Sequence, residues 1–352
     1  MPDYPPAESS PERPRRRVRY RGKNPRRFEE KYKEHQPGRY SDTVAKVLAS
    51  GKTPAGTHRP IMVAEVLAAL DPKPGEFAVD ATLGYGGHAQ EILPLLQPDG
   101  RLLGLDADPI ELPKTESRLR ALGFDEDTFT AHRTNFAGLP QVLAQNGISA
   151  ADIILADLGV SSMQLDDPAR GFSLKHDGPL DLRMNPQRGS PASVLLQKLS
   201  TQKLARLLLD NADESNPALA SSLAGKTFQT TRALTDAIRA ALPGVKDDER
   251  ELSVRRVFQA LRIEVNDEFS ALETFLRNLP ACLKPGGRVA ILTFHSGEDR
   301  RVKKAFEAGL RDGHYSEIAD EVVRPGAEER RANLRAASAK LRWARRRSAF
   351  RV

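Results

Sequence analysis

Two acidic residues, Asp106 and Asp157, each close an apolar segment and are well placed for chemistry at the edge of a sheet. A further apolar segment, residues 77–81, runs straight into the glycine-rich turn Gly84-Tyr85-Gly86-Gly87-His88. Many α/β folds hold a nucleoside cofactor with a glycine turn after one strand and a carboxylate at the tip of the next. The spacing therefore predicts a nucleoside-cofactor site.

The glycine spacing also indicates the kind of cofactor. It is not the G-x-G-x-x-G of dinucleotide-binding proteins, and no phosphate-loop lysine follows, which excludes an ATP-binding P-loop. A looser turn suits S-adenosylmethionine, whose methionine tail carries no phosphate. Asp106 would then accept hydrogen bonds from the two ribose hydroxyls. The alternatives are an ordinary strand–helix turn and, for Asp106, a helix N-cap or a surface acid.

Asp157 ends a segment, residues 153–157, that is apolar up to this acid, as strands buried on both faces are. Ligands of open α/β sheets lie beyond the carboxyl ends of the strands. A carboxylate there could accept a hydrogen bond from the exocyclic amino group of a base. It would favour the nucleophilic form of the nitrogen and offset the positive charge that develops during methyl transfer. The alternative is an acid that only orders the following loop.

Two further polar segments follow predicted strands. The first, residues 164–184, is rich in Asp, Gly and Arg and fits either an active-site loop or simply a long loop. The second begins with His295, whose imidazole could stack on or bind a base. The alternative is that Ser296 and Glu298 cap the next helix and that His295 is structural. The acids and histidine of this segment match no standard metal-site spacing, so no metal is expected.

Strands and helices alternate along most of the chain, which predicts an α/β fold with a doubly wound parallel sheet. The expected strands are residues 77–81, 102–106, 129–132, 153–157 and 288–294, and a helix is expected at 61–70.

About 120 residues between the last two of these strands have little strand character and are too long for a connection. We expect an inserted helical domain there, with Thr230 or Thr231 capping its last helix. The expected helices of the insert are 192–199, 201–209, 218–224 and 232–242, and the core is expected to resume with helices at 254–265 and 268–279.

The charge of the chain is concentrated at its ends. The 352 residues carry a formal net charge of +7 and a pI near 9.5. Residues 13–39 hold twelve Arg or Lys, and residues 324–351 hold ten against two Glu. Basic ends on a nearly balanced body favour a nucleic-acid partner over a pair of solvated tails. Residues 1–55 are too poor in aliphatic side chains to bury a core, so we expect disorder there.

The single cysteine, Cys282, allows no intramolecular disulfide and suits a reducing compartment. No apolar run is long enough to cross a bilayer, and the N-terminus lacks the apolar core of a signal peptide. A cytoplasmic protein is therefore expected, with an organelle transit sequence as the alternative reading of the Arg-rich leader.

Taken together, these segments resemble one family, the bacterial 16S ribosomal RNA cytosine N4-methyltransferases, which act on cytosine 1402 of the decoding region. The most specific matching run is Asp157 to Met184. The other matching pieces are His58-Arg59-Pro60, Asp80 to His88, Phe258 to Asn266 and Phe294-His295-Ser296.

The resemblance implies a class I S-adenosylmethionine-dependent methyltransferase core, a Rossmann-like doubly wound sheet, with an inserted helical domain that recognises rRNA. The implied domains are a basic extension at 1–55, a discontinuous core at 56–164 and 253–323, an insert at 165–252 and a basic C-terminal tail at 324–352. The implied cofactor contacts are Gly86, Gly87, His88, Asp106, Phe136 near the adenine, Asp157 and Gln164, and substrate contacts are expected from Arg170, Asp181, Arg183 and His295.

The expected activity is methylation of the N4 atom of a cytosine in 16S rRNA of the small ribosomal subunit, with S-adenosylmethionine as cofactor and Asp157 as the catalytic residue. One alternative is a nicotinamide-dependent oxidoreductase, which would carry a full G-x-G-x-x-G. The other is a non-catalytic RNA-binding or ribosome-assembly factor, which would lack the glycine turn or the two acids. The oligomeric state is left open, with a homodimer among the alternatives.

The chain departs from the family pattern in four places. Gly297 stands where the family usually has Leu, and Asn211-Ala212-Asp213-Glu214 replaces a Tyr-Gly-Glu-Glu-like patch. Asn333 to Ser338 reads Asn-Leu-Arg-Ala-Ala-Ser instead of Asn-Pro-Arg-Ala-Arg-Ser, and the leader of about 55 residues is extra. These departures spare the expected cofactor site and concern RNA docking.

Overall fold

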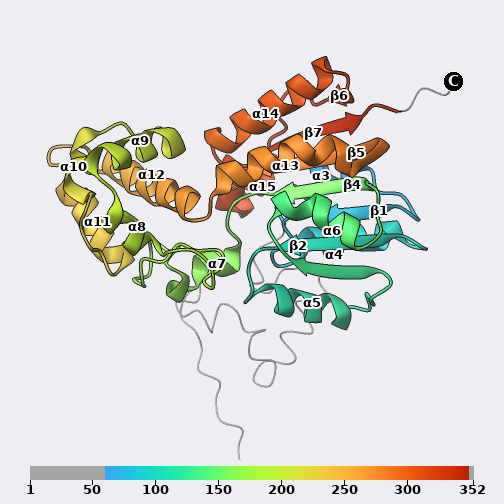
Figure 1. Cartoon of the computed structure of the whole chain (residues 1–352), viewed down its shortest axis with the longest axis horizontal. Coiled ribbons are helices and arrows are strands. Elements are labelled where there is room, and N and C mark those ends of the chain that lie inside the picture. Colours follow the sequence, from blue (N-terminus) through green and yellow to red (C-terminus); the bar gives the residue numbers. More distant parts are fainter. Residues whose placement is uncertain (1–59, 349–352) are drawn as a thin grey trace, which may run out of the picture.

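A computed structural model describes residues 60–348 of the chain (Figure 1). The predictions for the leader and for His58 and Arg59 lie outside the described residues.

A seven-stranded mixed sheet forms the centre of the larger lobe, with the strand order β3-β2-β1-β4-β5-β7-β6. The first five strands run parallel, and β7 lies antiparallel between β5 and β6. Their bounds are β1 Phe77–Asp80, β2 Arg101–Asp106, β3 Phe129–Arg133, β4 Ala151–Asp157, β5 Leu283–Thr293, β6 Tyr315–Ile318 and β7 Lys340–Arg346. The order reverses between β1 and β4, so a ligand crevice is expected beyond their carboxyl ends.

Helices cover both faces of this sheet, because the strand side chains alternate between two apolar cores. Ala78 and Leu155 pack with α3 Val63–Leu70, α4 Gly87–Leu96 and α5 Leu112–Ala121. Val79 and Ile154 pack with α6 Leu139–Gln145, α13 Glu268–Cys282 and α14 Ser296–Arg311 on the other side. This arrangement confirms the predicted doubly wound α/β fold, with two strands more than the sequence indicated.

The helical insert forms a second lobe with its own apolar core (Figure 1). Four predicted helices are present, and Thr230 caps the last of them by accepting a hydrogen bond from the Ala233 amide. Their bounds are α8 Ala192–Lys198, α9 Thr201–Ala212, α10 Pro217–Leu223 and α11 Thr231–Ala240.

A fifth helix, α12 Asp247–Val265, runs across the expected boundary at residue 253. Its buried residues Val254, Val257 and Phe258 belong to the apolar core of the insert. The helix α12 therefore packs with the insert from Val254 to near its C-terminal end at Val265, and the chain returns to the sheet through α13.

The C-terminal segment differs from the expected basic tail. Residues 340–346 form β7, whose Leu341 and Ala344 are fully buried. Several cations of this segment are paired within the protein, including Arg342 with Asp299 and Arg345 with Glu317. The prediction of a basic tail at 324–352 was wrong because the high density of charged residues hid the apolar pattern of a strand. Several of these cations are paired with acids of the protein, so they are not free to bind RNA.

Candidate active site

The carboxyl ends of β1, β2 and β4 open into a cavity of about 740 Å³. One part of its wall comes from the sheet, with Gly84, Asp106 and Asp157. The other part comes from segments on the side of the insert, with Met184, Asn266 and Phe269. The cavity thus lies where the fold places ligands, at the reversal of strand order and against the insert.

Two backbone positions in the glycine turn demand glycine. Gly86 has φ of 78° and precedes the first turn of α4. Gly87 has no room for a side chain, because a Cβ would lie 2.6 Å from the Pro60 ring. Gly87 and His88 line the cavity, whereas a side chain on Gly86 would point at Thr115 and Leu119. These glycines shape the turn, and the direct cofactor contact of Gly86 stays a prediction.

The carboxylate of Asp106 holds this turn in place. Its Oδ2 accepts a hydrogen bond of 2.7 Å from the Gly84 amide, and its Oδ1 accepts one of 2.8 Å from the Asp108 amide. Burial raises its pKa to about 6. Each carboxylate oxygen has a second lone pair, so Asp106 can still accept bonds from ribose hydroxyls. It is not the helix cap of the alternative reading.

Asp157 differs, because its side chain is poorly satisfied. Its backbone amide donates to Thr82 Oγ1 over 2.6 Å, which fixes the end of β4. Its Oδ1 is buried with no hydrogen-bond partner among the described residues. Burial and, to a smaller extent, the nearby Glu298 carboxylate raise the pKa of this carboxyl to about 7. An unpartnered carboxylate oxygen on a residue that lines a cavity marks Asp157 as a candidate functional group.

His88 lies in the first turn of α4 and is almost fully buried. Its Nε2 lies 3.0 Å from the Ile61 carbonyl oxygen, and its Nδ1 lies 3.6 Å from Asp157 Oδ2. The ring therefore faces the strand end, so only part of the residue is available to a cofactor.

Phe136 begins the short helix η2 Phe136–Gly138 beyond β3 and lines the cavity. Its ring packs edge-on against Phe275, with centroids 5.4 Å apart. The half-buried ring provides an apolar wall next to the Asp106 side of the cavity, where the resemblance places the adenine.

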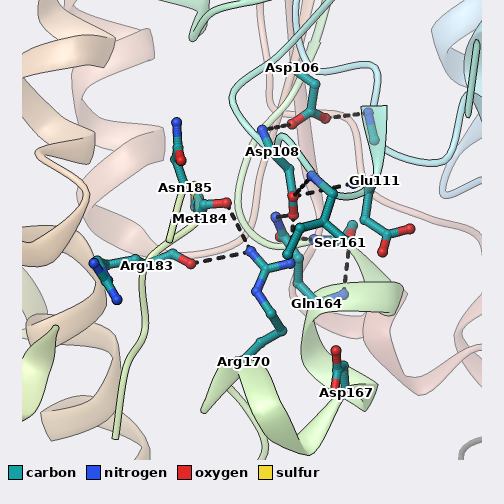
Figure 2. A network of polar contacts seen from close by, with 12 residues as sticks. Asp106, Asp108, Glu111, Ser161, Gln164, Asp167, Arg170, Arg183, Met184 and Asn185 are labelled. Carbon is teal, nitrogen blue, oxygen red and sulfur yellow. Dashed lines mark hydrogen bonds and ion pairs between the residues drawn. The ribbon is translucent and has the colours of Figure 1, made fainter. Parts of the chain in front are cut away.

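A buried polar network joins the cavity wall to the loops that lead into the insert (Figure 2). At its centre is Asp108, which is 1% exposed. Its Oδ2 accepts hydrogen bonds of 2.8 Å from Gln164 Nε2 and from Arg170 Nη1. Gln164 also closes a capping box with Ser161 at the start of α7 Ser162–Asp166. Both ends of its amide are thus engaged within the protein.

Arg170 ends the short helix η3 Pro168–Arg170, and its guanidinium is buried. Besides Asp108, it donates to the carbonyl oxygens of Met184 at 2.8 Å and Arg183 at 3.3 Å. Figure 2 shows it between the cofactor side and the 183–185 segment. The structure thus gives Arg170 a bridging position inside the protein, and it does not present the side chain to an RNA surface.

The other expected substrate contacts also have partners in the protein. Arg183 and Asp181 form a two-pronged ion pair, with both contacts at 2.7 Å. His295 is the N-cap of α14, where its Nδ1 accepts from the Glu298 amide and the Glu298 carboxylate accepts from the His295 amide. The structural alternative for this segment is therefore present, with His295 in place of Ser296 as the cap.

The departure at Gly297 has a physical account. A Cβ at this position would lie 2.6 Å from Cζ of Phe269. The Phe269 ring, which lines the cavity, fills that space and carries the Arg301 guanidinium 3.6 Å from its centroid. Glycine at 297 and phenylalanine at 269 are thus complementary in volume.

Sequence reasoning missed several residues of the site. Asp108 lay two residues beyond Asp106 and carried no motif of its own. Arg335 lines the cavity from η4 Leu334–Ser338 and pairs with Asp166 at 3.0 Å. The segment Asn333–Ser338 could be compared with a motif of the family from the sequence alone. Nothing in that motif, however, indicated that Arg335 would line the cavity.

The charged residues in the cavity wall indicate whether a dinucleotide or S-adenosylmethionine is the better fit. Asp106, Glu111, Asp157 and Glu298 all contribute to its wall. Burial is the main cause of the raised pKa values of Asp106 and Asp157, and neighbouring carboxylates raise them as well, which favours a cationic over an anionic ligand at these two residues. A dinucleotide would bring a pyrophosphate into this wall, whereas S-adenosylmethionine brings a sulfonium and an ammonium cation. The residues present fit the second cofactor.

Other chemistries find little support in the described residues. Within 60–348, no group of three or more His, Cys, Asp or Glu has the geometry to hold a metal. Cys282 is buried, and burial raises the pKa of its thiol to about 11, which leaves it a poor nucleophile. No helix in this range has the length and apolar character to cross a membrane.

The sheet order and the acidic nucleoside cavity define a class I S-adenosylmethionine-dependent methyltransferase. Residues 55–347 match the MraW methylase family, and the chain belongs to it. This membership removes the oxidoreductase alternative.

The chain is similar to curated relatives along nearly its whole length. It is 50% identical to ribosomal RNA small subunit methyltransferase H 2 of Alkaliphilus metalliredigens, over 95% of this chain and 98% of that protein. It is 49% identical to methyltransferase H 1 of Lachnoclostridium phytofermentans, over 94% and 92%. It is 42% identical to methyltransferase H of Halorhodospira halophila, over 73% of this chain and 80% of that protein.

The first two of these alignments correct one expectation. The first alignment covers 95% of the 352 residues, so fewer than 20 residues of this chain are left unmatched. Most of the 55-residue leader must therefore be aligned with the relative. The basic leader is therefore not extra with respect to these relatives.

Proposed function

We propose that this protein transfers a methyl group from S-adenosylmethionine to the exocyclic N4 of a cytosine in 16S rRNA, cytosine 1402 by the family resemblance. The observation that carries the proposal is Asp157 Oδ1, a buried and unpartnered acceptor at the carboxyl end of β4. Relatives named as small-subunit rRNA methyltransferases support the choice of RNA.

We assign the two parts of the cavity wall to different ligands, one to the cofactor and one to the target base. Asp106, Phe136 and the Gly87–His88 turn would hold the nucleoside and methionine parts of the cofactor. When bound, the cofactor supplies an electrophilic methyl group on sulfur. Asp157 lies at the border between these residues and the Met184, Asn266 and Phe269 wall. We assign the latter wall to the cytosine.

Asp157 would act on the amino group of that cytosine. The lone pair of N4 is delocalised into the ring, and a carboxylate that accepts an N–H hydrogen bond localises it on nitrogen. The same carboxylate offsets the positive charge on nitrogen as the methyl group arrives, and then takes the proton. A pKa near 7 suits a group that must release and bind a proton at physiological pH.

The target base must leave its stack to reach this depth, as bases do in other enzymes that modify them. We propose that the insert receives the surrounding rRNA, since its loops form the outer wall of the cavity. The basic leader would add phosphate contacts that weaken with salt. A small-subunit rRNA substrate supports our proposal that the protein acts in the cytoplasm.

The test is to incubate the protein with methyl-labelled S-adenosylmethionine and undermethylated small ribosomal subunits, and to map the modified nucleoside by mass spectrometry. The expected product is N4-methylcytidine at a single position. Methylation at carbon 5, or on another base, would contradict the assignment of Asp157 to an amino group.

A further inference from the structure

We infer that His88 and Asp157 form a proton-sharing pair, in which the imidazole prepares Asp157 to take the proton released by the methylated amino group. The inference rests on the proposed function, because it requires an amine acceptor. His88 would then be a positioning residue of the reaction, beyond any contact that it makes with the cofactor.

The first observation is the tautomer of His88. Its Nε2 lies 3.0 Å from the Ile61 carbonyl oxygen, and a carbonyl oxygen can only accept a hydrogen bond. The proton of the neutral ring is therefore on Nε2. The other nitrogen, Nδ1, is left with a lone pair that faces the end of β4.

The second observation is what this lone pair faces. Nδ1 lies 3.6 Å from Asp157 Oδ2; the His88 side chain is almost fully buried, whereas the Asp157 side chain is 29% exposed toward the cavity that it lines. A lone pair and a carboxylate oxygen repel each other unless a proton lies between them. The pair therefore has a place for one proton, while the second carboxylate oxygen, Oδ1, is enclosed and has no hydrogen-bond partner among the described residues. The exposed part of the Asp157 side chain lines the cavity, where a substrate can reach the carboxyl group.

Burial moves the pKa values of the two groups in opposite directions, lowering that of His88 and raising that of Asp157. Burial lowers the pKa of His88, and Asp80 on β1, Glu91 on α4 and Glu329 on α15 Ala327–Ala332 oppose that effect. Burial and Glu298 on α14 raise the pKa of Asp157 to about 7. A weakened base and a weakened acid thus face each other, which is the condition for sharing a proton rather than forming a fixed ion pair.

The proposed step balances as follows. The N4 lone pair bonds to the methyl carbon while the carbon–sulfur bond breaks, and its electron pair stays on sulfur as a neutral thioether. The cationic N4 then loses its N–H proton to the Asp157 carboxylate, whose partly exposed side chain lines the cavity. Rotation of the carboxyl group presents this proton to His88 Nδ1, and the proton passes to water after product release.

The direct test is nitrogen NMR of full-length protein labelled with ¹⁵N-histidine, with S-adenosylhomocysteine bound and with His88→Gln used for assignment. We expect the Nε2–H tautomer of His88 near neutral pH and protonation of Nδ1 on acidification. Asp157→Asn should move this midpoint to lower pH by about half a unit or more, since the anion favours the imidazolium. An Nδ1–H tautomer, or an unmoved midpoint, would overturn the inference.

A kinetic test separates this role from a structural one. His88→Gln should lower single-turnover methylation at least tenfold and move the acidic limb of the pH profile to lower pH, because an amide donor stabilises the Asp157 carboxylate. A uniform loss at every pH with no shift would count against the pair. His314→Gln, a change at an exposed histidine, is the control. If the unaltered protein methylates nothing, the proposed function fails, and the NMR result still decides whether the pair exists.

Discussion

The ends of β2 and β4 present the same residue type in neighbouring parts of one cavity, but with different partners. Asp106 at the end of β2 accepts two backbone hydrogen bonds and fixes the glycine turn. Asp157 at the end of β4 has an oxygen without a partner and a higher pKa, about 7 against about 6. A satisfied carboxylate suits binding, and an unsatisfied one suits a change of protonation during reaction.

The largest expected effect comes from Asp157→Asn. Loss of the proton acceptor should reduce single-turnover methylation about 10²–10⁴-fold. The affinity for S-adenosylhomocysteine should stay within about tenfold, because a typical hydrogen bond contributes about 0.5–1.5 kcal/mol. Quench-flow assays and calorimetry measure the two quantities. Asp152→Asn, at the other end of the same strand, is the control. Full activity in Asp157→Asn would remove the proposed role.

The next largest effect concerns the buried ion pair of Arg170 with Asp108, which connects the sheet core to the loops leading into the helical insert. Arg170→Met leaves the buried Asp108 carboxylate without its cation, which should lower the free energy of unfolding by about 3–5 kcal/mol. Chemical denaturation measures this. Arg206→Met, which breaks an exposed pair with Asp210, should cost under about 0.5 kcal/mol. Equal losses in both variants would show that the Asp108 network does not tie the insert to the core.

Asp106→Asn should act on binding rather than on the chemical step. Loss of a charged acceptor should weaken the affinity for S-adenosylhomocysteine by about 1.5–3 kcal/mol, roughly 10- to 150-fold. The rate at saturating cofactor should change little. In the unaltered protein, affinity should fall as the pH drops through about 6, because the protonated carboxyl accepts fewer bonds. A rate loss as large as that of Asp157→Asn would erase the distinction between the two strand ends.

The smallest expected effect is a gain in stability. The folded-state pKa of Asp157 lies above the unfolded value of 3.8, so its charging destabilises the fold as the pH rises from about 4 to about 7. Asp157→Asn should therefore stabilise the protein by about 1–2 kcal/mol at pH 8 and by less at pH 4. Melting curves at the two pH values measure the difference. A loss of stability at pH 8 would indicate that the carboxylate is satisfied in solution.

Most of the fold could be predicted because its signals are local. The first four parallel strands have apolar segments of suitable length, and glycine turns and caps mark the neighbouring helices. The C-terminal strand could not be predicted in the same way, since arginines flank Leu341 and Ala344 and are neutralised by acids such as Asp299, which is distant in sequence. Such pairing is visible only once the chain is folded.

The site was predictable to the same degree. Asp106 and Asp157 could be located because strand ends meet at one edge of a sheet, and Phe136 was implied by the family resemblance. All three line the cavity. Arg170 and His295 could not be assigned, because a polar residue in a loop looks the same whether it faces RNA or a buried partner. The pairing of His88 with Asp157 likewise depends on how α4 leaves the glycine turn, which no spacing encodes.

The most direct measurement for the central claim is the pH dependence of single-turnover methylation by the unaltered protein, with cofactor and undermethylated subunits bound beforehand. The rate should rise with pH and level off at or below about pH 7, because bound cationic cofactor favours the Asp157 carboxylate. A rate that is independent of pH between about 5 and 8, with both substrates still bound, would contradict the claim that Asp157 takes the proton.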